Sequence, residues 1–515
     1  MGNPTDVAAS GSLIATISIF QWFLLFWILS IGIIVFRANA KANRQAKLGA
    51  RAPQVPSSLP FGFSVLLQLI RNLRTNTVLE WTRNTLDVPG RTVELNLGGT
   101  KMVMTDNVEN IRAMMSTQFN DFGKGELYRK IWSSLMRNSI LTTDGQAWQT
   151  NRDHLVAHVA KIRPTDYAVT EKHTRNLVRV LSDGQPHDTL DLLNRFAIDV
   201  VSDVFYGTST DTLLSKDQSL RDAIQQHKNR NTWRNLLSGL GVMLPPDRKA
   251  SETIDNYLDK VVNSFSPENS ETREEQDRKA QSLLGVLSAQ GLSKDVMKDA
   301  IISVAVGGRD SVAIIITWAL YELVRHPDIQ RELRTEISNA LRAKAPGAAQ
   351  LEGLELLNSV VLETMRLHTS VGVNTRAALK DTTLPSGGGP AGTSPVGIFA
   401  GTTVIMGLDS VHRRTDIYGP DANEYKPHRW DARKPDTWSY FPFNRGPRSC
   451  LGKNIATMEV KFTLCRLLQT FSSIELVSKV GDAVVPVDVQ NSPPMKTKMA
   501  LNTKPAETVW LRFKE

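Results

Sequence analysis

Residues 443–452 constrain this chain more than any other stretch. They contain Cys450, one of only two cysteines among 515 residues, in a glycine- and proline-bearing segment rather than an apolar run. Glycine and proline keep such a loop compact and let backbone N–H groups point toward the sulfur. Residues 453–471 then carry apolar side chains at helical spacing, which predicts a helix that begins directly after the loop.

A cysteine that closely follows two arginines, at a helix N-terminus, is expected to have a lowered pKa and to be held as a thiolate. A second interpretation of Cys450 is a small buried core side chain, because most free cysteines lie in the core. The other cysteine, Cys465, falls inside the predicted helix and is interpreted as a core residue of this kind.

Phe443, Gly446, Arg448, Cys450 and Gly452 resemble, position for position, the haem-binding loop of the cytochrome P-450 monooxygenases. The resemblance implies a haem b cofactor, iron protoporphyrin IX, with the Cys450 thiolate as the axial ligand of the iron. It also implies that Phe443, Arg448 and Gly452 belong to the cofactor-binding site. The fold that it implies is mostly α-helical with smaller β-sheets.

Residues 11–36 form a run of 26 residues without a formal charge, and about 20 apolar residues suffice to cross a bilayer. A cleaved signal peptide is the competing interpretation, but it would have a shorter apolar core with a basic residue ahead of it. Only Asp6 is charged before the run, and five basic residues lie between positions 37 and 51. The positive-inside rule then predicts a single transmembrane helix, with residues 1–10 in the lumen of the endoplasmic reticulum and the rest in the cytosol.

Residues 37–62 combine these basic side chains with Pro53, Pro56 and Pro60. Because proline cannot continue a helix, we expect a semi-rigid hinge, similar to the one that the family's membrane-bound members carry. Residues 63–515 show no internal repeat, and we expect them to form one monooxygenase domain.

The composition excludes several other classes of protein. Two cysteines cannot build a disulfide framework or a cysteine-rich zinc site. The net charge of +9 is spread along the chain, whereas a nucleic-acid-binding protein would gather it in a basic stripe. A basic surface that faces an acidic protein partner or anionic lipid is the better interpretation.

The resemblance assigns two further arginines to the haem. A helix is predicted to begin after Asp144, which caps it, and Trp148 and Arg152 share one face because they are four residues apart. As a bare pair they would be a packed tryptophan beside a surface arginine. The resemblance implies instead that both bind a haem propionate, and that Arg376 in a later strand meets a propionate as well.

The apolar helix predicted at residues 293–325 carries Gly307, Gly308, Asp310 and Ser311 at its centre. Glycines inside a helix cost roughly 1 kcal/mol each against alanine, and an acid among apolar residues is costly when unpaired. We therefore expect the helix to open locally. The alternative is that the glycines allow close helix packing and that the acid caps or forms a salt bridge.

This segment resembles the family's oxygen-activation motif, in which an acid and an alcohol beside the haem relay protons. The resemblance makes Asp310 and Ser311 the candidate catalytic residues. Ser311 stands where threonine is commoner, and serine lacks the methyl group that restricts the rotamer of threonine. We therefore expect an effect on the coupling between oxygen use and product.

Glu363 and Arg366 are three residues apart in a predicted helix that is otherwise apolar. A buried ion pair of this kind needs additional partners, and Arg429 is the candidate. The resemblance implies a structural Glu–Arg–Arg triad made by these three residues. His428 stands close to a position where the family often has an acid, so we expect local differences in hydrogen bonding.

Two patterns refine the fold. Alternating apolar residues on both sides of Gly98-Gly99 predict a β-hairpin at residues 91–105. A glycine-rich stretch at residues 384–392, followed by the sequence Val411-His412-Arg413-Arg414, particularly resembles the fungal branch that hydroxylates alkanes and fatty acids.

The resemblance thus implies a membrane-anchored monooxygenase that inserts one oxygen atom into a C–H bond of a lipophilic substrate. The sequence contains no nucleotide-binding glycine fingerprint, so electrons are expected from a separate reductase, which the resemblance implies to be NADPH-dependent. Two other classes compete with this interpretation. One is a haem-thiolate isomerase or dehydratase that acts on a peroxide without a reductase, and the other is a haem-binding sensor. Asp310 and Ser311 favour the monooxygenase over both.

Four segments are expected to line the substrate pocket, at residues 122–140, 301–311, 369–373 and 492–499. Their aliphatic, aromatic and small side chains select for an apolar ligand. A long-chain fatty acid or alkane is one candidate substrate. A fungal secondary metabolite such as a polyketide or terpenoid is the other.

Overall fold

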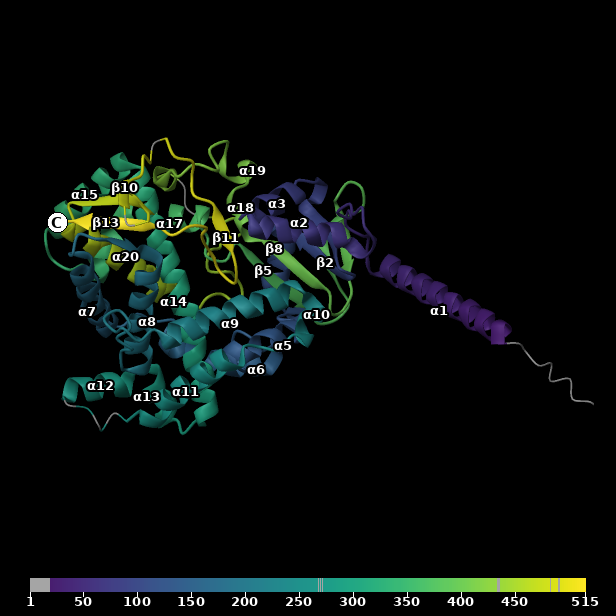
Figure 1. Cartoon of the computed structure of the whole chain (residues 1–515), viewed down its shortest axis with the longest axis horizontal. Helices are drawn as coiled ribbons and strands as arrows, with labels where there is room; N and C mark the ends of the chain where they lie inside the picture. Colours follow the sequence, from purple (N-terminus) through teal and green to yellow (C-terminus); the bar gives the residue numbers. More distant parts are fainter. Residues whose placement is uncertain are drawn as a thin grey trace, which may run out of the picture.

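The computed structural model describes residues 19–266, 268, 270, 272–432, 436–481, 483–489 and 491–515. The predicted lumenal tail, residues 1–10, and the first part of the predicted span, residues 11–18, lie outside the described residues. The first described element is helix α1 (Ile19–Leu48), which projects away from the rest of the molecule (Figure 1).

The described strands form one five-stranded sheet, one four-stranded sheet and two separate hairpins. The five-stranded sheet has the order β1 (Thr92–Leu97), β2 (Thr100–Thr105), β8 (Thr403–Gly407), β5 (Val373–Ala378), β3 (Phe122–Gly123). The four-stranded sheet has the order β10 (Ala483–Pro486), β9 (Ser473–Val480), β13 (Trp510–Lys514), β4 (Pro186–Asp188). The hairpins pair β6 (Thr382–Gly388) with β7 (Ser394–Ile398), and β11 (Thr497–Met499) with β12 (Thr503–Pro505). The hairpin predicted at residues 91–105 is confirmed, because β1 and β2 pair antiparallel.

Helices account for most of the remaining described chain, which confirms the predicted fold class. They are α2 (Phe63–Arg74), α3 (Val78–Thr85), α4 (Val108–Arg112), α5 (Gly125–Met136), α6 (Gly145–Val159), α7 (Pro164–Leu181), α8 (Thr189–Tyr206), α9 (Ser219–Leu236), α10 (Ser238–Met243) and α11 (Arg248–Ser264). They continue with α12 (Arg273–Gln281), α13 (Leu283–Ala289), α14 (Lys294–Arg325), α15 (Pro327–Leu341), α16 (Ala348–Gly353), α17 (Glu355–Leu367), α18 (Leu408–His412), α19 (Thr415–Tyr418) and α20 (Lys453–Thr470).

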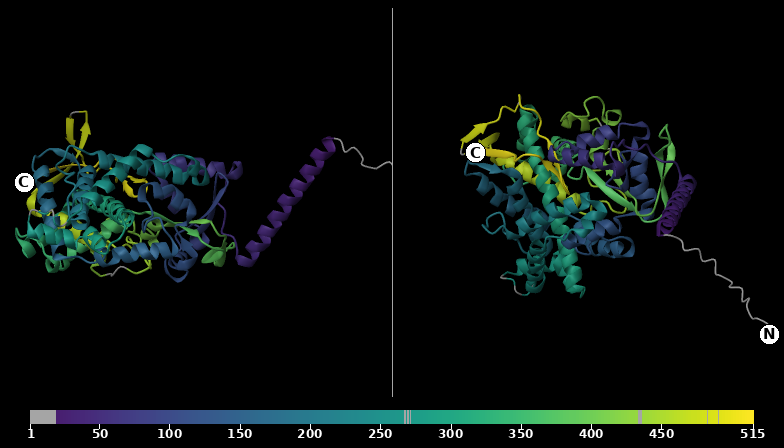
Figure 2. Two further views of the ribbon diagram at one scale, coloured as in Figure 1. Left: turned by 90° about the horizontal axis from the view of Figure 1, so that it is seen from below. Right: turned by 45° about the vertical axis from the view of Figure 1, so that its right-hand side comes forward.

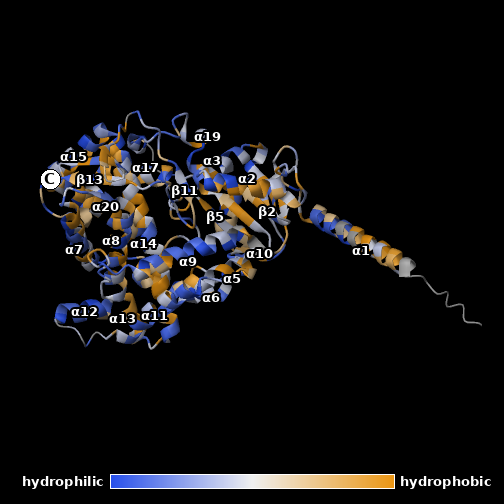
Figure 3. Cartoon of the chain, in the orientation of Figure 1, coloured by the Kyte–Doolittle hydropathy of each residue, from blue (hydrophilic) through white to orange (hydrophobic). Residues whose placement is uncertain are grey.

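Helix α1 is long and apolar enough to cross a bilayer. Its stretch Trp22–Leu48 reaches a mean hydropathy of 2.0 over a window of which nothing is buried. Figure 3 shows α1 changing from hydrophobic at its far end to hydrophilic where it meets the body. The other helix that passes the same test is α14, but 78 % of its window is buried, so it is a core helix.

The basic end of α1 is bonded to the hairpin β6–β7, which lies at its base (Figure 2, left). Arg44 forms a salt bridge with Asp381 just ahead of β6. The Gln45 side-chain amide donates to the Gly397 carbonyl oxygen at 3.1 Å. These contacts join the last turns of α1 to a hairpin that lies more than three hundred residues later in the sequence.

The backbone after α1 continues this contact. The Ala50 N–H donates to the Pro395 carbonyl at 2.9 Å, and the Gly397 N–H donates back to the Ala50 carbonyl at 3.0 Å. A Cβ atom at Gly49 would lie 2.8 Å from the Gly397 nitrogen, so these two backbone segments approach too closely for a side chain at Gly49. We name the contacts of Arg44, Gln45 and Ala50 with this hairpin the α1 clasp.

The proline-rich segment predicted as a hinge runs along the edge of the five-stranded sheet. The Glu94 N–H of β1 donates to the Pro53 carbonyl at 2.8 Å, and the Val55 N–H donates to the Glu94 carbonyl at 3.0 Å. Proline lacks an N–H, but its carbonyl and the N–H groups of its neighbours still pair. This part of the segment is therefore bonded to the body of the protein.

Helix α14 crosses the centre of the molecule and packs on α8, α17 and α20. Side chains on all its faces are buried, which explains why its sequence is apolar all round. A Cβ atom at Gly308 would lie 2.7 Å from Cγ2 of Val201 on α8. The helix is regular through Gly307 and Gly308, so the predicted local opening was wrong. The close packing against α8 accounts for one of the two glycines.

The side chains of Glu363, Arg366 and Arg429 lie in contact with one another. Glu363 and Arg366 are fully buried, and Arg366 donates from Nε and Nη2 to the two Glu363 carboxylate oxygens at 2.9 and 2.8 Å. Arg429 Nε and the Trp430 indole N–H also donate to that carboxylate, at 2.9 and 3.1 Å. The carboxylate therefore has the additional partners that a buried ion pair requires. The hydrogen bonds of His428 go instead to surface carboxylates.

Candidate active site

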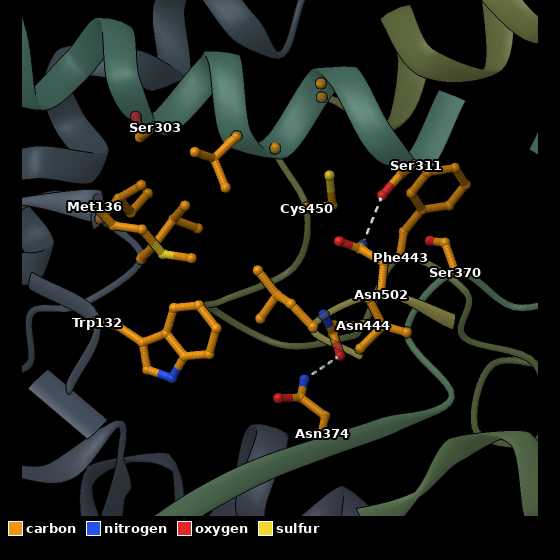
Figure 4. Close-up of a pocket in the computed structure, with 18 of the residues that line it drawn as sticks. Trp132, Met136, Ser303, Ser311, Ser370, Asn374, Phe443, Asn444, Cys450 and Asn502 are labelled. Carbon is orange, nitrogen blue, oxygen red and sulfur yellow. Dashed lines mark hydrogen bonds between the residues drawn. The ribbon is translucent and has the colours of Figure 1, made fainter. Parts of the chain in front are cut away.

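One cavity of about 850 Å³ lies between α5, α6, α14, β5 and the cysteine loop. All four segments predicted for the pocket contribute to its lining, the last of them through Lys498 and Met499. The fourth prediction, residues 492–499, was wrong in extent, because residues 498–502 line the cavity. The turn between β11 and β12, rather than the chain ahead of it, reaches inward. Figure 4 shows Cys450, Ser311 and Asn502 around this cavity.

The cysteine loop is folded by its own backbone. The Cys450 N–H donates to the Phe443 carbonyl at 2.9 Å. Gly446 has a φ of 68°, and a Cβ atom there would lie 1.7 Å from the Met115 carbonyl oxygen. Only glycine fits this position. The loop leads directly into α20, whose N-cap residue is Gly452.

The Cys450 side chain is exposed to the cavity, although protein surrounds it deeply. Burial raises the pKa of the Cys450 thiol, while the Gly452 N–H and the Arg152 guanidinium lower it by less. The prediction of a lowered pKa was therefore wrong for the protein alone, because desolvation of the thiolate outweighs the loop and the arginine. A bound metal cation deprotonates a coordinating thiol outright.

Three cations from different elements line the cavity close to one another. They are Lys124 before α5, Arg376 on β5 and Arg448 in the cysteine loop. Burial, and then repulsion by Arg376 and Arg448, lower the pKa of Lys124 far below its ordinary value. Arg448 pairs with Asp144 at 2.6 Å, but its Nε has no partner among the described residues. The side-chain donors of Arg376 bond to the Asn374 amide and a backbone carbonyl.

Asp144 does not cap α6, as its position in the sequence predicted. Its carboxylate accepts from the backbone N–H groups of Lys124 and Gly125, both at 2.8 Å, at the start of α5. It also binds the Arg448 guanidinium. The helix start and the arginine together offer charge-assisted hydrogen bonds that a cap of its own helix would lack. Asp144 thereby ties α5 to the cysteine loop.

Trp148 and Arg152 lie on α6 and line the same cavity. The Arg152 guanidinium lies 5.8 Å from the centroid of the Trp148 ring, and that of Arg448 lies 4.6 Å from it. Arg152 Nη1 lies 3.4 Å from the Ser449 carbonyl oxygen. The structure therefore brings both residues next to the cysteine loop.

The two candidate catalytic residues lie on different sides of α14. Ser311 lines the cavity, whereas Asp310 does not, because adjacent residues on a helix point about 100° apart. The Asp310 carboxylate forms a buried ion pair with Lys228 of α9. Burial, with repulsion by Arg309 and Lys504, lowers the pKa of Lys228 well below its ordinary value, whereas the carboxylate in contact with it favours the ammonium form.

No sequence motif singled out Lys124, Glu459 or Asn502, although all three line the cavity and Lys124 falls in the pocket segment predicted at residues 122–140. Each is a single polar residue without a neighbour of matching chemistry in the sequence. Only the fold brings them to the cavity. For Asn502, the sequence of the turn between β11 and β12 could have predicted where the chain reverses, but not the direction in which the turn points.

The protein has a helical body and a cysteine that faces a large cavity, and basic side chains outnumber the carboxylates beside that cysteine. This arrangement is typical of a class of protein that binds an anionic cofactor. The chain belongs to the cytochrome P-450 family, whose sequence model matches residues 53–493. The predicted family is thereby confirmed, and the chain is a monooxygenase of this family.

Its relatives include the cytochrome P-450 monooxygenase pvhE of Talaromyces variabilis, which is 31 % identical over 94 % of each chain. The cytochrome P-450 monooxygenase himC of Aspergillus japonicus is 31 % identical over 81 % of this chain and 77 % of its own length. Cytochrome P-450 52A13 of Debaryomyces hansenii is 29 % identical over 88 % of this chain and 92 % of its own length. All three come from fungi, as the narrower resemblance predicted.

The family implies a haem iron cofactor, and the residues of the cavity fit one. Cys450 offers a sulfur ligand that is accessible from the cavity. The positive charges of Arg376 and Arg448 face the negative charge of Asp144. Lys124 can take up a proton beside an added carboxylate, so the three side chains together provide positive charge for two propionates. The unpartnered Nε of Arg448 provides a free donor for such a group.

Proposed function

We propose that this enzyme binds haem b through the Cys450 thiolate and oxidises a lipophilic substrate with molecular oxygen. One oxygen atom enters a C–H bond and the other becomes water, so that RH, O₂, two electrons and two protons give ROH and H₂O. The observation that supports this proposal best is that Cys450 and Ser311 line the same cavity. When bound, the haem iron supplies the oxygen activation that no side chain can provide.

The cationic residues of the cavity hold the cofactor in this proposal. Arg376 and Arg448 would neutralise the propionates, because Asp144 offers them one negative charge. Lys124 would join them once a propionate beside it favours its ammonium form. Trp148 and Arg152 bind a propionate from α6, as the resemblance implied. Arg–carboxylate pairs are strong and directional, so these residues would hold the cofactor in one orientation.

The loop residues and the triad keep the ligand in place. Phe443 accepts the Cys450 N–H, and Gly452 offers its own N–H to the sulfur. Hydrogen bonds to a thiolate stabilise its charge and tune the metal. Glu363, Arg366 and Arg429 serve as the structural triad beneath this loop.

Proton delivery is the task of Ser311 and Asp310. The Ser311 hydroxyl can donate toward the substrate and oxygen space, since it faces the cavity. Asp310 replenishes that proton from the other side of α14, where it pairs with Lys228. A water molecule must connect the two groups, because they point about 100° apart.

Electrons come from a separate NADPH-dependent reductase, and α1 anchors the enzyme in the endoplasmic reticulum membrane. Residues 1–10 form the lumenal tail, residues 11–36 the span and residues 37–62 the segment that joins it to the body. Residues 63–515 form the catalytic domain in the cytosol. The exposed apolar surface of α1 and the basic residues that follow support this arrangement.

The substrate is lipophilic, because aliphatic and aromatic side chains form most of the cavity lining outside the cation cluster. A long-chain fatty acid or alkane is the first candidate class. A fungal secondary metabolite such as a polyketide or terpenoid is the second. Product analysis after incubation with reductase, NADPH and members of each class decides between them.

The ligand assignment is tested on the purified protein. Reduced protein exposed to carbon monoxide is expected to show the red-shifted Soret band of a thiolate-bound haem. Cys450→Ala and Cys450→His are expected to lose that band, while Cys465→Ala, which removes the other cysteine from the core, is the matched control and should keep it. An unchanged spectrum in Cys450→Ala would place the ligand elsewhere and overturn the proposal.

A further inference from the structure

Asn502 connects the two sides of α14. It lies in the turn between β11 and β12, which reaches into the cavity. Its side-chain Nδ2 lies 3.5 Å from Ser311 Oγ, a contact drawn as a dashed line in Figure 4. Its Oδ1 accepts from Lys228 Nζ at 3.3 Å, and Lys228 forms the ion pair with Asp310. The Asn502 amide therefore contacts both Ser311 and Lys228, the ion-pair partner of Asp310.

The orientation of this amide follows from its partners. A lysine ammonium can donate hydrogen bonds but cannot accept them, so the oxygen of the Asn502 amide must face Lys228. The NH₂ group then faces Ser311, and the serine oxygen accepts from it. A hydroxyl has only one proton to donate. The Ser311 O–H is therefore left to point away from Asn502, into the cavity.

Other hydroxyls on α14 behave differently. Ser303 donates to the Ala300 carbonyl at 2.7 Å, and Thr317 donates to the Ala313 carbonyl at 2.7 Å. Both protons are thereby used by the backbone of their own helix. In the described part of the chain, the hydrogen-bond partner of Ser311 is Asn502 instead. Its proton stays available for a ligand in the cavity.

We infer that Asn502 is a positioning residue that holds the Ser311 hydroxyl in the rotamer required for proton delivery. Threonine limits its own side-chain rotamers through its methyl group, and serine does not. In this chain the hydrogen bond from Asn502 takes over that restriction. The ion pair of Lys228 and Asp310 contributes indirectly, because it orients the amide. This inference rests on the proposed function and deepens it.

The first test compares Asn502→Leu in two backgrounds. With Ser311 present, we expect product per NADPH to fall about two- to tenfold, the range that one neutral hydrogen bond supplies. The missing product should appear as hydrogen peroxide, because oxygen then takes up two electrons and two protons without entering the substrate. With Ser311→Thr, the same substitution should change the ratio less than about twofold, since threonine restricts its own rotamer.

Asn502→Asp separates the two contacts of the amide. A carboxylate still accepts from Lys228, but it cannot donate to Ser311. It accepts the serine proton instead and turns the hydroxyl away from the cavity. We expect a loss of coupling at least as large as in Asn502→Leu, with near-normal thermal stability. Asn491→Ala, which removes an asparagine that bonds to Asp488 nearby, is the matched control and should keep the wild-type ratio.

A spectroscopic readout tests the positioning without turnover. The stretching frequency of carbon monoxide bound to the reduced protein reports hydrogen bonding to its oxygen. Asn502→Leu is expected to shift and broaden this band, because the Ser311 hydroxyl then occupies several rotamers. The shift should be smaller with Ser311→Thr. A side chain that merely lined the cavity would move the band equally in both backgrounds.

Two results would overturn the inference. The first is an equal effect of Asn502→Leu on coupling in the serine and threonine backgrounds, which would make the two positions independent. The second is wild-type coupling in Asn502→Asp. Neither result bears on the assignment of Cys450 as the iron ligand, because all Asn502 variants should retain the Soret band of the carbon monoxide complex. The proposed function itself would be contradicted by a different result, namely that Cys450→Ala keeps the same Soret band.

Discussion

Glu459 is a buried acid that the proposed reaction does not use. It lies on α20, is 2 % exposed and lines the cavity. Burial, with a smaller contribution from Asp166, raises its pKa to about 8. The folded protein therefore holds this carboxyl group protonated over a range of pH in which the unfolded chain ionises it.

This shift makes the stability of the protein depend on pH. An acid whose pKa is higher in the folded state binds more protons there, so stability falls as pH rises from the unfolded value of 4.5 to about 8 and then levels off. Glu459→Gln should remove this slope. We expect the melting temperature of wild type to fall relative to that of the variant between about pH 5 and about pH 9. Parallel melting curves over that range would show that Glu459 is not a buried neutral acid.

At the residue scale, sequence motifs predicted which residues lie together, but not the pKa values of their side chains. The spacing of Glu363 and Arg366 predicted an ion pair, and the structure contains it. The pKa of Cys450 was misjudged because a sequence shows nearby arginines but not the depth of burial. Asp144 bonds to the start of α5 and to Arg448 rather than to its own helix. The sequence could not show this, because Arg448 lies 304 residues away.

At the scale of elements, the packing of α14 on α8 depends on one missing side chain. Gly308 meets Val201, while Gly307 has nothing within 4 Å of the position where its Cβ would lie. The two adjacent glycines therefore differ in their environment. Periodicity predicted the helix but could not show which glycine faces a neighbour.

Alanine substitutions at Gly307 and Gly308 test this difference in packing through the free energy of unfolding. Gly308→Ala is expected to lower the free energy of unfolding by about 1–3 kcal/mol, because its methyl group would overlap Val201. Gly307→Ala is the matched control and should gain up to about 1 kcal/mol from its better helix propensity. Val201→Ala should recover part of the loss in Gly308→Ala. Equal stability of the two alanine variants in denaturant unfolding would contradict this account.

Turns were the elements that the sequence placed least well. Residues 498–502 line the cavity, because the turn between β11 and β12 points inward. A strand pattern shows where a hairpin reverses, but not the direction in which its tip projects. The start of α14 was predicted more closely, because its cap is a local signal that Ser293 supplies.

At the scale of the whole molecule, the α1 clasp changes how the anchor is understood. The sequence predicted a semi-rigid proline-rich hinge between the anchor and the body. The structure instead bonds Arg44, Gln45 and Ala50 to the hairpin β6–β7. Sequence patterns could not show this, because the partners lie at residues 381–397 and carry no complementary motif.

Two truncations separate the anchor from the clasp. Deletion of residues 2–36 should weaken membrane association but leave haem incorporation largely intact, because it spares the clasp. Deletion of residues 2–51 also removes the clasp and should lower the melting temperature. Membrane flotation, haem content and thermal unfolding measure these effects. Unchanged flotation of the shorter deletion would require another attachment surface, and equal melting temperatures would show that the clasp contributes nothing.

The α1 clasp also has a mechanical consequence. Gly49 lies too close to the chain of Gly397 to allow a side chain, so the junction cannot swivel like a flexible tether. Helix α1 has 30 described residues, which makes it a lever roughly 45 Å long at about 1.5 Å per residue. With its outer part held in a bilayer, any tilt of the lever turns the whole body by the same angle. The orientation of the cavity relative to the lipid surface is then set by the bending stiffness of one helix.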